Sequence, residues 1–252
     1  MIDIENAKKI FVNDIKNFDT SHKKFEVKVG HSFRVMNNCK MIATKLNMNE
    51  EEIEVAQLIG LLHDLAKLKQ YGIPKENKKD HGDYAAEILK NNDYIRNYIK
   101  DNKYDNVILK AIANHNKYHI EEGLTSKELI FANIIRDADR IDIFYEMTEI
   151  FKISKDNYYN LTITNEILKD FMTNESESID KKKIKVDIDK VIWITSFIYV
   201  ISFKCSLEYL KNENLINRMI DRFDYNKNLK IQMDEVKKIA NNFINEKLKK
   251  DD

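Results

Sequence analysis

Apolar residues recur with the period of an α-helix along almost the whole chain. Polar, turn-forming stretches interrupt this period at Asn47–Asn49, Gly72–Lys79, Asn91–Asp93, Gly123–Ser126 and Thr173–Lys185. The last of these is also the most polar stretch, and we interpret it as a solvated connection rather than a mobile lid. The pattern predicts an all-α fold in which short loops join successive helices.

The most apolar run, Val191–Phe203, contains 13 residues. A helix that spans a bilayer needs about 20 apolar residues, so this run predicts a central core helix instead. The N-terminal segment Met1–Ile15 mixes charged and apolar residues and contains no signal-peptide hydrophobic region. We therefore expect a cytoplasmic protein that does not associate with membranes.

The composition agrees with long helices, because five Gly and one Pro provide few turn formers. A chain of 252 residues can bury a large core, and we expect one domain over residues 1–252. The 42 basic and 42 acidic residues cancel, so stable nucleic-acid binding is not expected. Cys39 and Cys205 match no metal-knuckle spacing and are expected to be reduced. The sequence does not indicate an oligomeric state.

Five polar residues with metal-binding side chains lie on otherwise apolar helix faces. They are His31, His63, His81, His115 and Asp139. A sixth, Asp64, directly follows His63. Because a metal site between helices needs its ligands on the inward faces, the pattern predicts that these side chains point into a core.

A buried histidine alone has an ordinary explanation, since most are hydrogen-bonded core residues. A buried carboxylate is different, because its burial costs several kcal/mol unless it is paired or binds a cation. Asp64 and Asp139 therefore both need partners. One metal centre accounts for all six residues together, and the mixture of imidazoles and carboxylates suits a divalent transition metal.

Three short motifs surround these residues: His31 in Gly-His-Ser-Phe-Arg-Val, His63-Asp64 in Leu-Leu-His-Asp-Leu-Ala-Lys, and Asp139 in Arg-Asp-Ala-Asp-Arg-Ile-Asp. Their order and spacing resemble the signature of the HD superfamily of metal-dependent phosphohydrolases, over about residues 25–150. The resemblance implies an HD-domain-like helical bundle with these four residues around one metal. About residues 154–250 would then form additional C-terminal helices.

Two further histidines resemble those of the binuclear branch of this superfamily: His81 in His-Gly-Asp-Tyr-Ala-Ala-Glu-Ile-Leu and His115 in Ala-Ile-Ala-Asn-His-Asn-Lys. The resemblance implies that Asp64 bridges two metals and that both histidines hold the second. His22 is expected at the surface, and His119 either lines the pocket or is exposed.

One activity of the superfamily is not expected. Cyclic-dinucleotide phosphodiesterases of the HD-GYP type carry a second His after the one that matches His115, and then a Gly-Tyr-Pro element. This chain has Asn116 and Glu121-Glu122-Gly123-Leu124 instead.

The resemblance implies one or two divalent ions, from among Mn, Fe, Co, Ni, Mg and Zn. Such an ion lowers the pKa of bound water from about 15.7 towards 7, and the resulting hydroxide would attack phosphorus. The expected catalytic residues are Asp64 and Lys67, and the expected substrate contacts are Lys67, Arg34, Arg140 and Asp142. Lys67 could instead be a solvated lysine at a helix C-terminus, and Asp142 could accept a hydrogen bond from a ligating histidine.

We therefore expect an enzyme, a metal-dependent phosphohydrolase that cleaves a phosphoester or phosphoanhydride of a small nucleotide or related phosphorylated metabolite. Two alternatives stay open. The first is a di-iron oxygenase of the same superfamily, which shares the six-ligand pattern. The second is a non-catalytic sensor that binds a nucleotide in a metal-supported pocket. A fold alone does not name the reaction.

Overall fold

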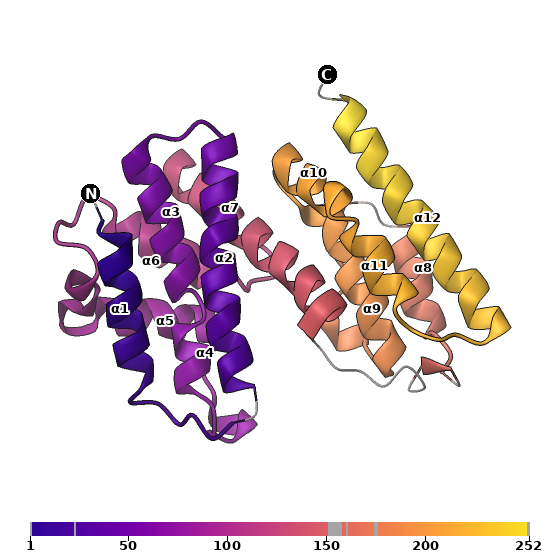
Figure 1. Ribbon diagram of the computed structural model, residues 1–252, viewed down its shortest axis with the longest axis horizontal. Helices are drawn as coiled ribbons and strands as arrows, with labels where there is room; N and C mark the ends of the chain where they lie inside the picture. The colour runs from indigo at the N-terminus through magenta and orange to yellow at the C-terminus, as the bar shows by residue number, and fades with distance from the viewer. Residues whose placement is uncertain (1, 23, 151–157, 160, 174–175, 251–252) are drawn as a thin grey trace. The chain divides into compact units, whose positions relative to one another are not determined.

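The computed structural model describes residues 2–22, 24–150, 158–159, 161–173 and 176–250 (Figure 1). These residues form helices and no strand, which confirms the predicted all-α fold. The α-helices are α1 (Ile4–Ile15), α2 (Phe25–Lys45), α3 (Glu50–Leu62), α4 (Leu65–Lys69), α5 (His81–Lys90), α6 (Asp105–Asn114), α7 (Ser126–Tyr145), α8 (Asn165–Thr173), α9 (Asp187–Thr195), α10 (Lys204–Asn212), α11 (Leu215–Asp221) and α12 (Lys227–Lys250). Short 3-10 helices cover Lys75–Asn77, Asn91–Asn97, Lys181–Lys183 and Ser196–Val200, and a π-helical turn covers Glu146–Ile150.

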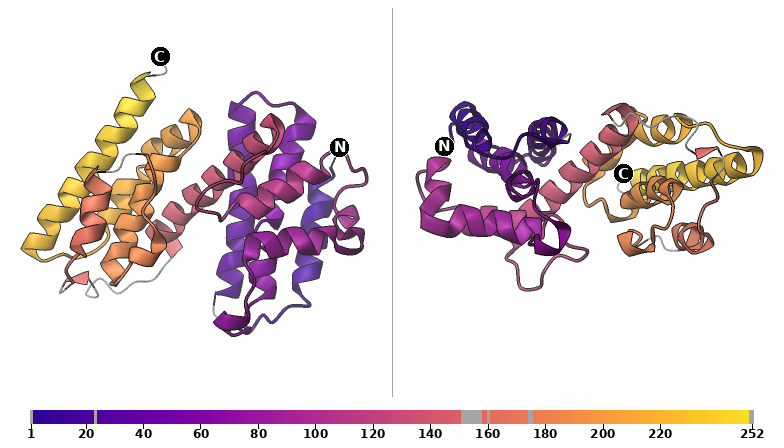
Figure 2. Two further views of the ribbon diagram at one scale, coloured as in Figure 1. Left: turned by 180° about the vertical axis from the view of Figure 1, so that it is seen from behind. Right: turned by 90° about the horizontal axis from the view of Figure 1, so that it is seen from below.

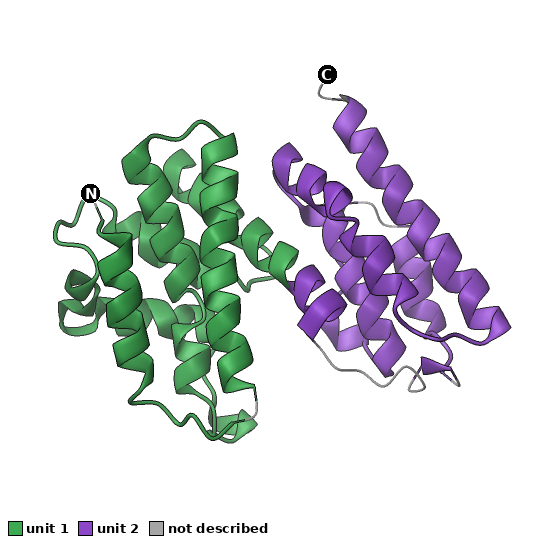
Figure 3. Cartoon of the chain, viewed as in Figure 1, with its two compact units in different colours: residues 1–142 green, residues 143–252 purple. Residues whose placement is uncertain are grey.

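The chain divides into two compact units, residues 1–142 and 143–252 (Figure 3). The first unit contains α1 to α6 and most of α7, and α8 to α12 belong to the second. Most of the predicted core of about residues 25–150 therefore lies in the first unit. The single domain expected over residues 1–252 stays a prediction.

In the first unit, α2 and α3 run side by side as an antiparallel pair (Figure 1). The turn between them uses Asn47 with a φ of 54°, and the Asn49 side chain caps α3 by accepting a hydrogen bond from the Glu52 amide at 3.0 Å. Val35 and Leu58 are fully buried between these helices and their neighbours. These two helices position part of the candidate site, because His31 lies on α2 and His63 directly follows α3.

The predicted breaks coincide with real connections. Asn47–Asn49 separates α2 from α3, and Gly72–Lys79 separates α4 from α5. Gly123–Ser126 leads into α7, which begins at Ser126. Asn92 and Asp93 both have a φ of 52°, which interrupts helical geometry after α5. Thr173–Lys185 lies between α8 and α9, although residues 174 and 175 fall outside the described part, and its interpretation as a plain connection stays a prediction.

The apolar run Val191–Phe203, predicted as a core helix, is largely buried, but only part of it is α-helical. α9 ends at Thr195, a 3-10 helix follows to Val200, and the last three residues are not helical. The hydroxyls of Thr195 and Ser196 donate to backbone carbonyls one turn earlier, at 2.7 and 2.6 Å. Hydroxyl side chains that compete for these carbonyls weaken a helix, which accounts for the change.

The second unit packs its helices around an apolar core of its own. Phe171, Ile188 and Met233 are fully buried there. Figure 2 shows α12, in yellow, lying along α10 and α11. Across the part of the chain that the structure describes, no helix is both long enough and apolar enough to cross a bilayer.

Candidate metal centre

The helices of the first unit bring the six predicted ligands together. α2, α5 and α7 supply His31, His81 and Asp139; His63 and Asp64 lie between α3 and α4, and His115 directly follows α6. Three overlapping groups made only of these six residues have ligand atoms within 4.8 Å of one another: His31–His63–Asp64, His63–His115–Asp139 and Asp64–His81–His115. Residues on or beside these helices thus form one cluster, which we call the His/Asp cluster.

The His63-Asp64 pair lies in a break between two helices, although the helical period of apolar residues continues across it. α3 ends at Leu62, and Asp64 has φ −99° and ψ 13° before α4 begins. Nδ1 of His63 donates at 2.8 Å to the carbonyl of Gly60, which a continued helix would pair with the Asp64 amide. The side chain of His63 therefore helps to end α3.

Asp64 is at the centre of the cluster, and its side chain is 2 % exposed. Its Oδ2 lies 3.6 Å from Nε2 of both His31 and His63. Its Oδ1 lies 3.5 Å from Nε2 of His81 and 3.6 Å from Nε2 of His115. The two oxygens therefore face two different pairs of imidazoles. No hydrogen bond to Oδ1 occurs among the described residues.

Asp139 faces the first pair of imidazoles. Its Oδ1 lies 3.0 Å from Nε2 of His31 and 3.9 Å from Nε2 of His63, and these two nitrogens are 3.2 Å apart. Ligand atoms that share an ion at bond lengths of about 2.0–2.2 Å lie about 3.0–3.6 Å apart. The spacings of Nε2 of His31 from His63, Asp64 and Asp139 fall within this range and suit one divalent ion beside His31, whereas the spacing between His63 and Asp139 is wider.

Two histidines are oriented by backbone carbonyls. His63 donates from Nδ1 to Gly60, and His115 donates from Nδ1 to Ile112 at 2.7 Å. A neutral imidazole that donates from Nδ1 keeps the Nε2 lone pair for a cation. Both rings thus present a ligand atom to the cluster.

Asp142 orients a third histidine. It is 1 % exposed, and its Oδ2 accepts a hydrogen bond from Nδ1 of His31 at 2.6 Å. Arg34 donates to both oxygens of Asp142, at 2.6 and 3.0 Å. The geometry agrees with Asp142 as the acceptor for a ligating histidine and gives Arg34 the role of holding that acceptor. Contacts of Asp142 and Arg34 with a substrate stay predictions.

His81 is held differently, because its Nδ1 lies 3.3 Å from the amide nitrogen of Asn116, which also donates to Asp80 at 2.7 Å. The neighbouring Gly82 allows α5 to approach the end of α6. A Cβ there would lie 2.4 Å from Oδ1 of Asn116 and 2.9 Å from a backbone carbonyl of α6. This close approach places the ring of His81 4.9 Å from that of His115.

Two lysines contact the Asp64 carboxylate. Nζ of the predicted Lys67 and Nζ of Lys28 each lie 3.3 Å from Oδ2. The Lys67 side chain is 40 % exposed and that of Lys28 is 15 % exposed. Lys28 was not predicted from the sequence, although its position one helical turn before His31 is a usable signal. Arg140, another predicted substrate contact, has Nη1 3.7 Å from Asp137, and its role with substrate stays a prediction.

Arg136 is a second residue that the sequence did not reveal. Its guanidinium, on α7, is buried and donates to the carbonyls of Asn114, Lys117 and Tyr118. These carbonyls belong to residues on either side of His115, where the chain leaves α6. Arg136 therefore fixes the position of that ligand from a neighbouring helix.

Electrostatics keep the two carboxyl groups ionised. Burial alone would raise the pKa of Asp64, but the charges of Lys67 and Lys28 hold it well below its usual range. Burial would likewise raise the pKa of Asp139, and the hydrogen bond with His31 lowers it instead. Both groups are therefore anionic at neutral pH and able to bind a cation.

The imidazoles differ from one another in their protonation. Burial lowers the pKa of His63 to about 3 and that of His81 to about 4, so both rings are neutral at pH 7. Burial would also lower the pKa of His31, but hydrogen bonds to Asp139 and Asp142 raise it to about 9. In the absence of a metal, His31 therefore carries a proton at pH 7.

We predict that metal affinity rises with pH because an ion must displace this proton from His31. Between pH 6.5 and 8.5, below the raised pKa of about 9, the affinity for Co²⁺ should rise about tenfold per pH unit. About one proton should be released for each ion bound. Calorimetric titrations in buffers of different ionisation enthalpy measure both quantities, and pH-independent binding without proton release would contradict the prediction.

The remaining histidines lie outside the cluster. His22 is exposed, as expected, and its ring stacks on Tyr71 with centroids 4.2 Å apart. His119 is also exposed, and its ring contacts Tyr118. Neither ring belongs to the groups of residues that could hold an ion.

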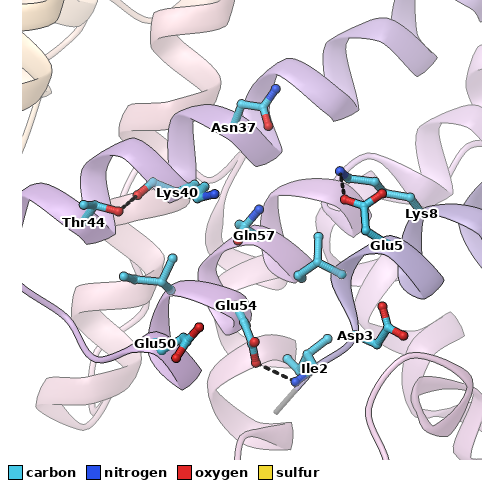
Figure 4. A pocket seen from close by; sticks show the side chains of 12 residues that line it. Ile2, Asp3, Glu5, Lys8, Asn37, Lys40, Thr44, Glu50, Glu54 and Gln57 are labelled. Atoms are coloured by element: carbon cyan, nitrogen blue, oxygen red, sulfur yellow. Dashed lines mark hydrogen bonds and ion pairs between the residues drawn. The ribbon is translucent and has the colours of Figure 1, made fainter.

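A separate pocket lies between the N-terminal segment, α1, α2 and α3 (Figure 4). Its charged groups include Lys8, which pairs with Glu5, and Glu54, which accepts a hydrogen bond from the backbone amide of Ile2. None of the six candidate ligands lines it. This pocket is therefore separate from the His/Asp cluster.

The model of the HD domain family matches residues 29–143. The matched segment contains all six residues of the His/Asp cluster, and the match confirms the resemblance found in the three motifs. No curated protein and no solved structure matches the chain.

Proposed function

Because residues 29–143 form an HD domain, we propose that this chain is a metal-dependent phosphohydrolase of a small nucleotide or a related phosphorylated metabolite. HD domains bind divalent metals, and the family consists mostly of metal-dependent hydrolases. The proposal rests on the groups that surround the Asp64 carboxylate. This buried carboxylate has two oxygens that face different pairs of imidazoles, and two lysines lie beside it.

The residues of the cluster fit a divalent ion. Oδ1 of Asp64 is buried without a hydrogen bond among the described residues, which costs free energy unless a cation takes its lone pair. In the proposal, one ion is held by His31, His63, Asp64 and Asp139, and a second, when present, by Asp64, His81 and His115. A bound divalent ion supplies Lewis acidity and lowers the pKa of bound water.

The chain's own groups complete the proposed site. Lys67 reaches from the cluster to solvent and supplies a positive charge to phosphoryl oxygens, whose charge must be stabilised during transfer. Asp142, held by Arg34, keeps Nε2 of His31 directed at the cluster. An anionic substrate is favoured because both lysines stand beside the candidate ligands.

The proposal predicts phosphate or pyrophosphate release from at least one nucleotide when the protein is loaded with Mn²⁺, Co²⁺, Mg²⁺ or Ni²⁺. His63→Ala should lower this release by about 100-fold, because it removes a ligand from the cluster. The matched control is His119→Ala, which truncates an exposed histidine and should leave the rate unchanged.

Three results would contradict the proposed function. Release that His63→Ala does not reduce would place the activity elsewhere. Oxygen consumption by iron-loaded protein, without phosphate release, would favour the oxygenase. Tight nucleotide binding without turnover under any metal would favour a sensor.

A further inference from the structure

The pocket between the N-terminal segment, α1, α2 and α3 lies within the first unit and has a volume of about 860 Å³ (Figure 4). Pockets that bind small organic ligands commonly have volumes of about 300–1,000 Å³. Three isoleucines, Ile2, Ile4 and Ile53, line it together with acidic side chains. The pocket therefore has the size and the mixed apolar and acidic lining of a site for a small organic ligand.

Gln57, in the middle of α3, is buried against this pocket without a protein partner for its side chain. The residue is 8 % exposed, and its side-chain amide forms no hydrogen bond with the residues that the structure describes. In Figure 4 the amide lies between the lining side chains of α2 and those of the N-terminal segment. Burying a carboxamide without a hydrogen bond costs free energy, which a leucine of similar size would avoid. A ligand with polar hydrogens in the pocket satisfies this amide.

The acidic side chains near Gln57 have few basic partners. Glu54, one turn earlier on α3, accepts a hydrogen bond from the Ile2 amide through Oε2 at 2.6 Å, and its Oε1 accepts none from the described residues. In Figure 4, Asp3 and Glu50 lie on either side of Glu54. None of these three carboxylates forms an ion pair with a described lysine, arginine or histidine. A helix start accounts for an acid at Asp3 or Glu50, but Glu54 lies beyond the first turn of α3.

Two lysines also line the pocket. Nζ of Lys8 pairs with Glu5 at 2.6 Å, so these two charges cancel. The other lysine is Lys40, which lies on α2 and is exposed. The remaining carboxylates of the described lining residues outnumber this single ammonium group. Such an acidic excess favours a ligand with more than one positive charge.

The carboxylates of the pocket do not converge as the ligands of a metal ion do. A bound Ca²⁺ or Mg²⁺ holds its oxygen ligands at about 2.0–2.6 Å. Among the described residues, the groups whose ligand atoms lie within 4.8 Å of one another include no residue of this pocket. The negative charges are therefore spread over the lining, and they match positive charges that an apolar chain holds apart.

We propose that this pocket binds an aliphatic diamine or polyamine. The ammonium groups of the ligand pair with the carboxylates of Asp3, Glu50 and Glu54 and donate to the carbonyl oxygen of Gln57, and its methylene groups contact the isoleucines. None of the six candidate metal ligands lines the pocket, so binding there does not depend on the proposed function.

Calorimetric titration of the wild type at low ionic strength tests the class of ligand. We expect 1,5-diaminopentane to bind at least about tenfold more tightly than pentylamine, which has the same chain but one ammonium group. Spermidine, with a third amine, should bind at least as tightly as the diamine. Mg²⁺ at the same concentration should not displace the diamine. Asp64→Asn should bind it like the wild type, because the His/Asp cluster is separate from the pocket.

Gln57→Leu tests the buried amide. This variant should bind 1,5-diaminopentane about tenfold more weakly than the wild type, because a hydrogen-bond acceptor is lost. Its stability to urea should not fall, because the amide has no partner among the described residues. The matched control is Gln232→Leu at a half-buried position on α12, which should bind the diamine like the wild type.

Glu54→Gln tests the charge. The amide oxygen of the new side chain still accepts the hydrogen bond from Ile2, but the negative charge is gone, so diamine affinity should fall about tenfold. Glu235→Gln makes the same change at an exposed position on α12 and should bind the diamine like the wild type. Circular dichroism verifies that each variant is folded.

Equal binding of pentylamine and 1,5-diaminopentane would overturn the inference, and so would the absence of any binding of the diamine and of spermidine to the wild type. Undiminished diamine binding by folded Gln57→Leu or folded Glu54→Gln would also overturn it, because the diamine would then bind elsewhere. Displacement of the diamine by Mg²⁺ at equal concentration would show that the carboxylates attract any cation and would overturn the assignment to amines.

Discussion

Asp64→Asn should abolish tight metal binding and lower phosphohydrolase activity by at least about 1,000-fold. The side chain of Asp64 is 2 % exposed, and its two oxygens face different pairs of imidazoles, so one substitution removes a ligand from each group. The amide offers one weaker oxygen ligand. Its nitrogen also directs a donor towards an Nε2 atom of the cluster, where a cation is needed.

The loss should come from the site and not from unfolding. Lys67 and Lys28 lose their carboxylate partner in this variant, but both side chains reach water in part. We therefore expect the unfolding free energy of the metal-free protein to fall by only about 1–2 kcal/mol. Metal content after gel filtration, steady-state rates and urea unfolding measure the three effects.

Asp93→Asn is the matched control for this substitution, because it makes the same change at an exposed position where the φ of 52° suits Asn. It should retain the metal and the activity of the wild type. An Asp64→Asn variant that keeps both would show that the cluster does not hold the ion in the way proposed.

The fold class was predictable because its signals are local. The helical period needs no knowledge of neighbours, and the breaks follow from single residues. Asn47 adopts a positive φ that Asn tolerates, and Asn49 provides the side-chain cap that begins α3. Such signals act within a few residues of the chain, so they can be recognised from the sequence.

The break at His63-Asp64 was not predictable in the same way. Residues 61–67 contain neither Gly nor Pro, and they continue the apolar period. The break depends on a side-chain hydrogen bond from His63 to Gly60 and on the packing of the pair within the cluster. The same reason explains why the contact between Lys28 and Asp64 was missed, because it joins α2 to the end of α3.

The types of the candidate ligands could be predicted, but not how each one is held. The cost of burying Asp64 and Asp139 pointed to a cation from the sequence alone. That Arg34 is engaged with Asp142, and that Arg136 fixes the segment around His115, depends on contacts between separate helices. Sequence spacing does not contain these contacts.

Gly60→Ala should lower the unfolding free energy by about 2–3 kcal/mol. A Cβ at this position would lie 2.8 Å from Cα and 2.9 Å from the backbone nitrogen of Met36, and 3.0 Å from Sγ of Cys39. Backbone atoms of α2 cannot move alone, so α2 and α3 must separate. The gain of about 1 kcal/mol in helix propensity from Gly to Ala does not offset this strain.

The separation of α2 from α3 should also weaken metal binding. His31 lies on α2 and His63 directly follows α3, and their Nε2 atoms are 3.2 Å apart. Moving the helices apart lengthens this distance, so metal affinity should fall about tenfold or more together with stability. Urea unfolding and Co²⁺ titration measure the two effects on the same variant.

Gly123→Ala is the matched control, because nothing lies within 4 Å of its added Cβ and the φ of 80° alone opposes the change. It should cost about 1 kcal/mol and leave metal affinity unchanged. If Gly60→Ala is as stable as the wild type, the contact between α2 and α3 adapts to an added methyl group. If it is destabilised but binds Co²⁺ normally, His31 and His63 are held by their own hydrogen bonds to Asp142 and Gly60, not by the spacing of the helices.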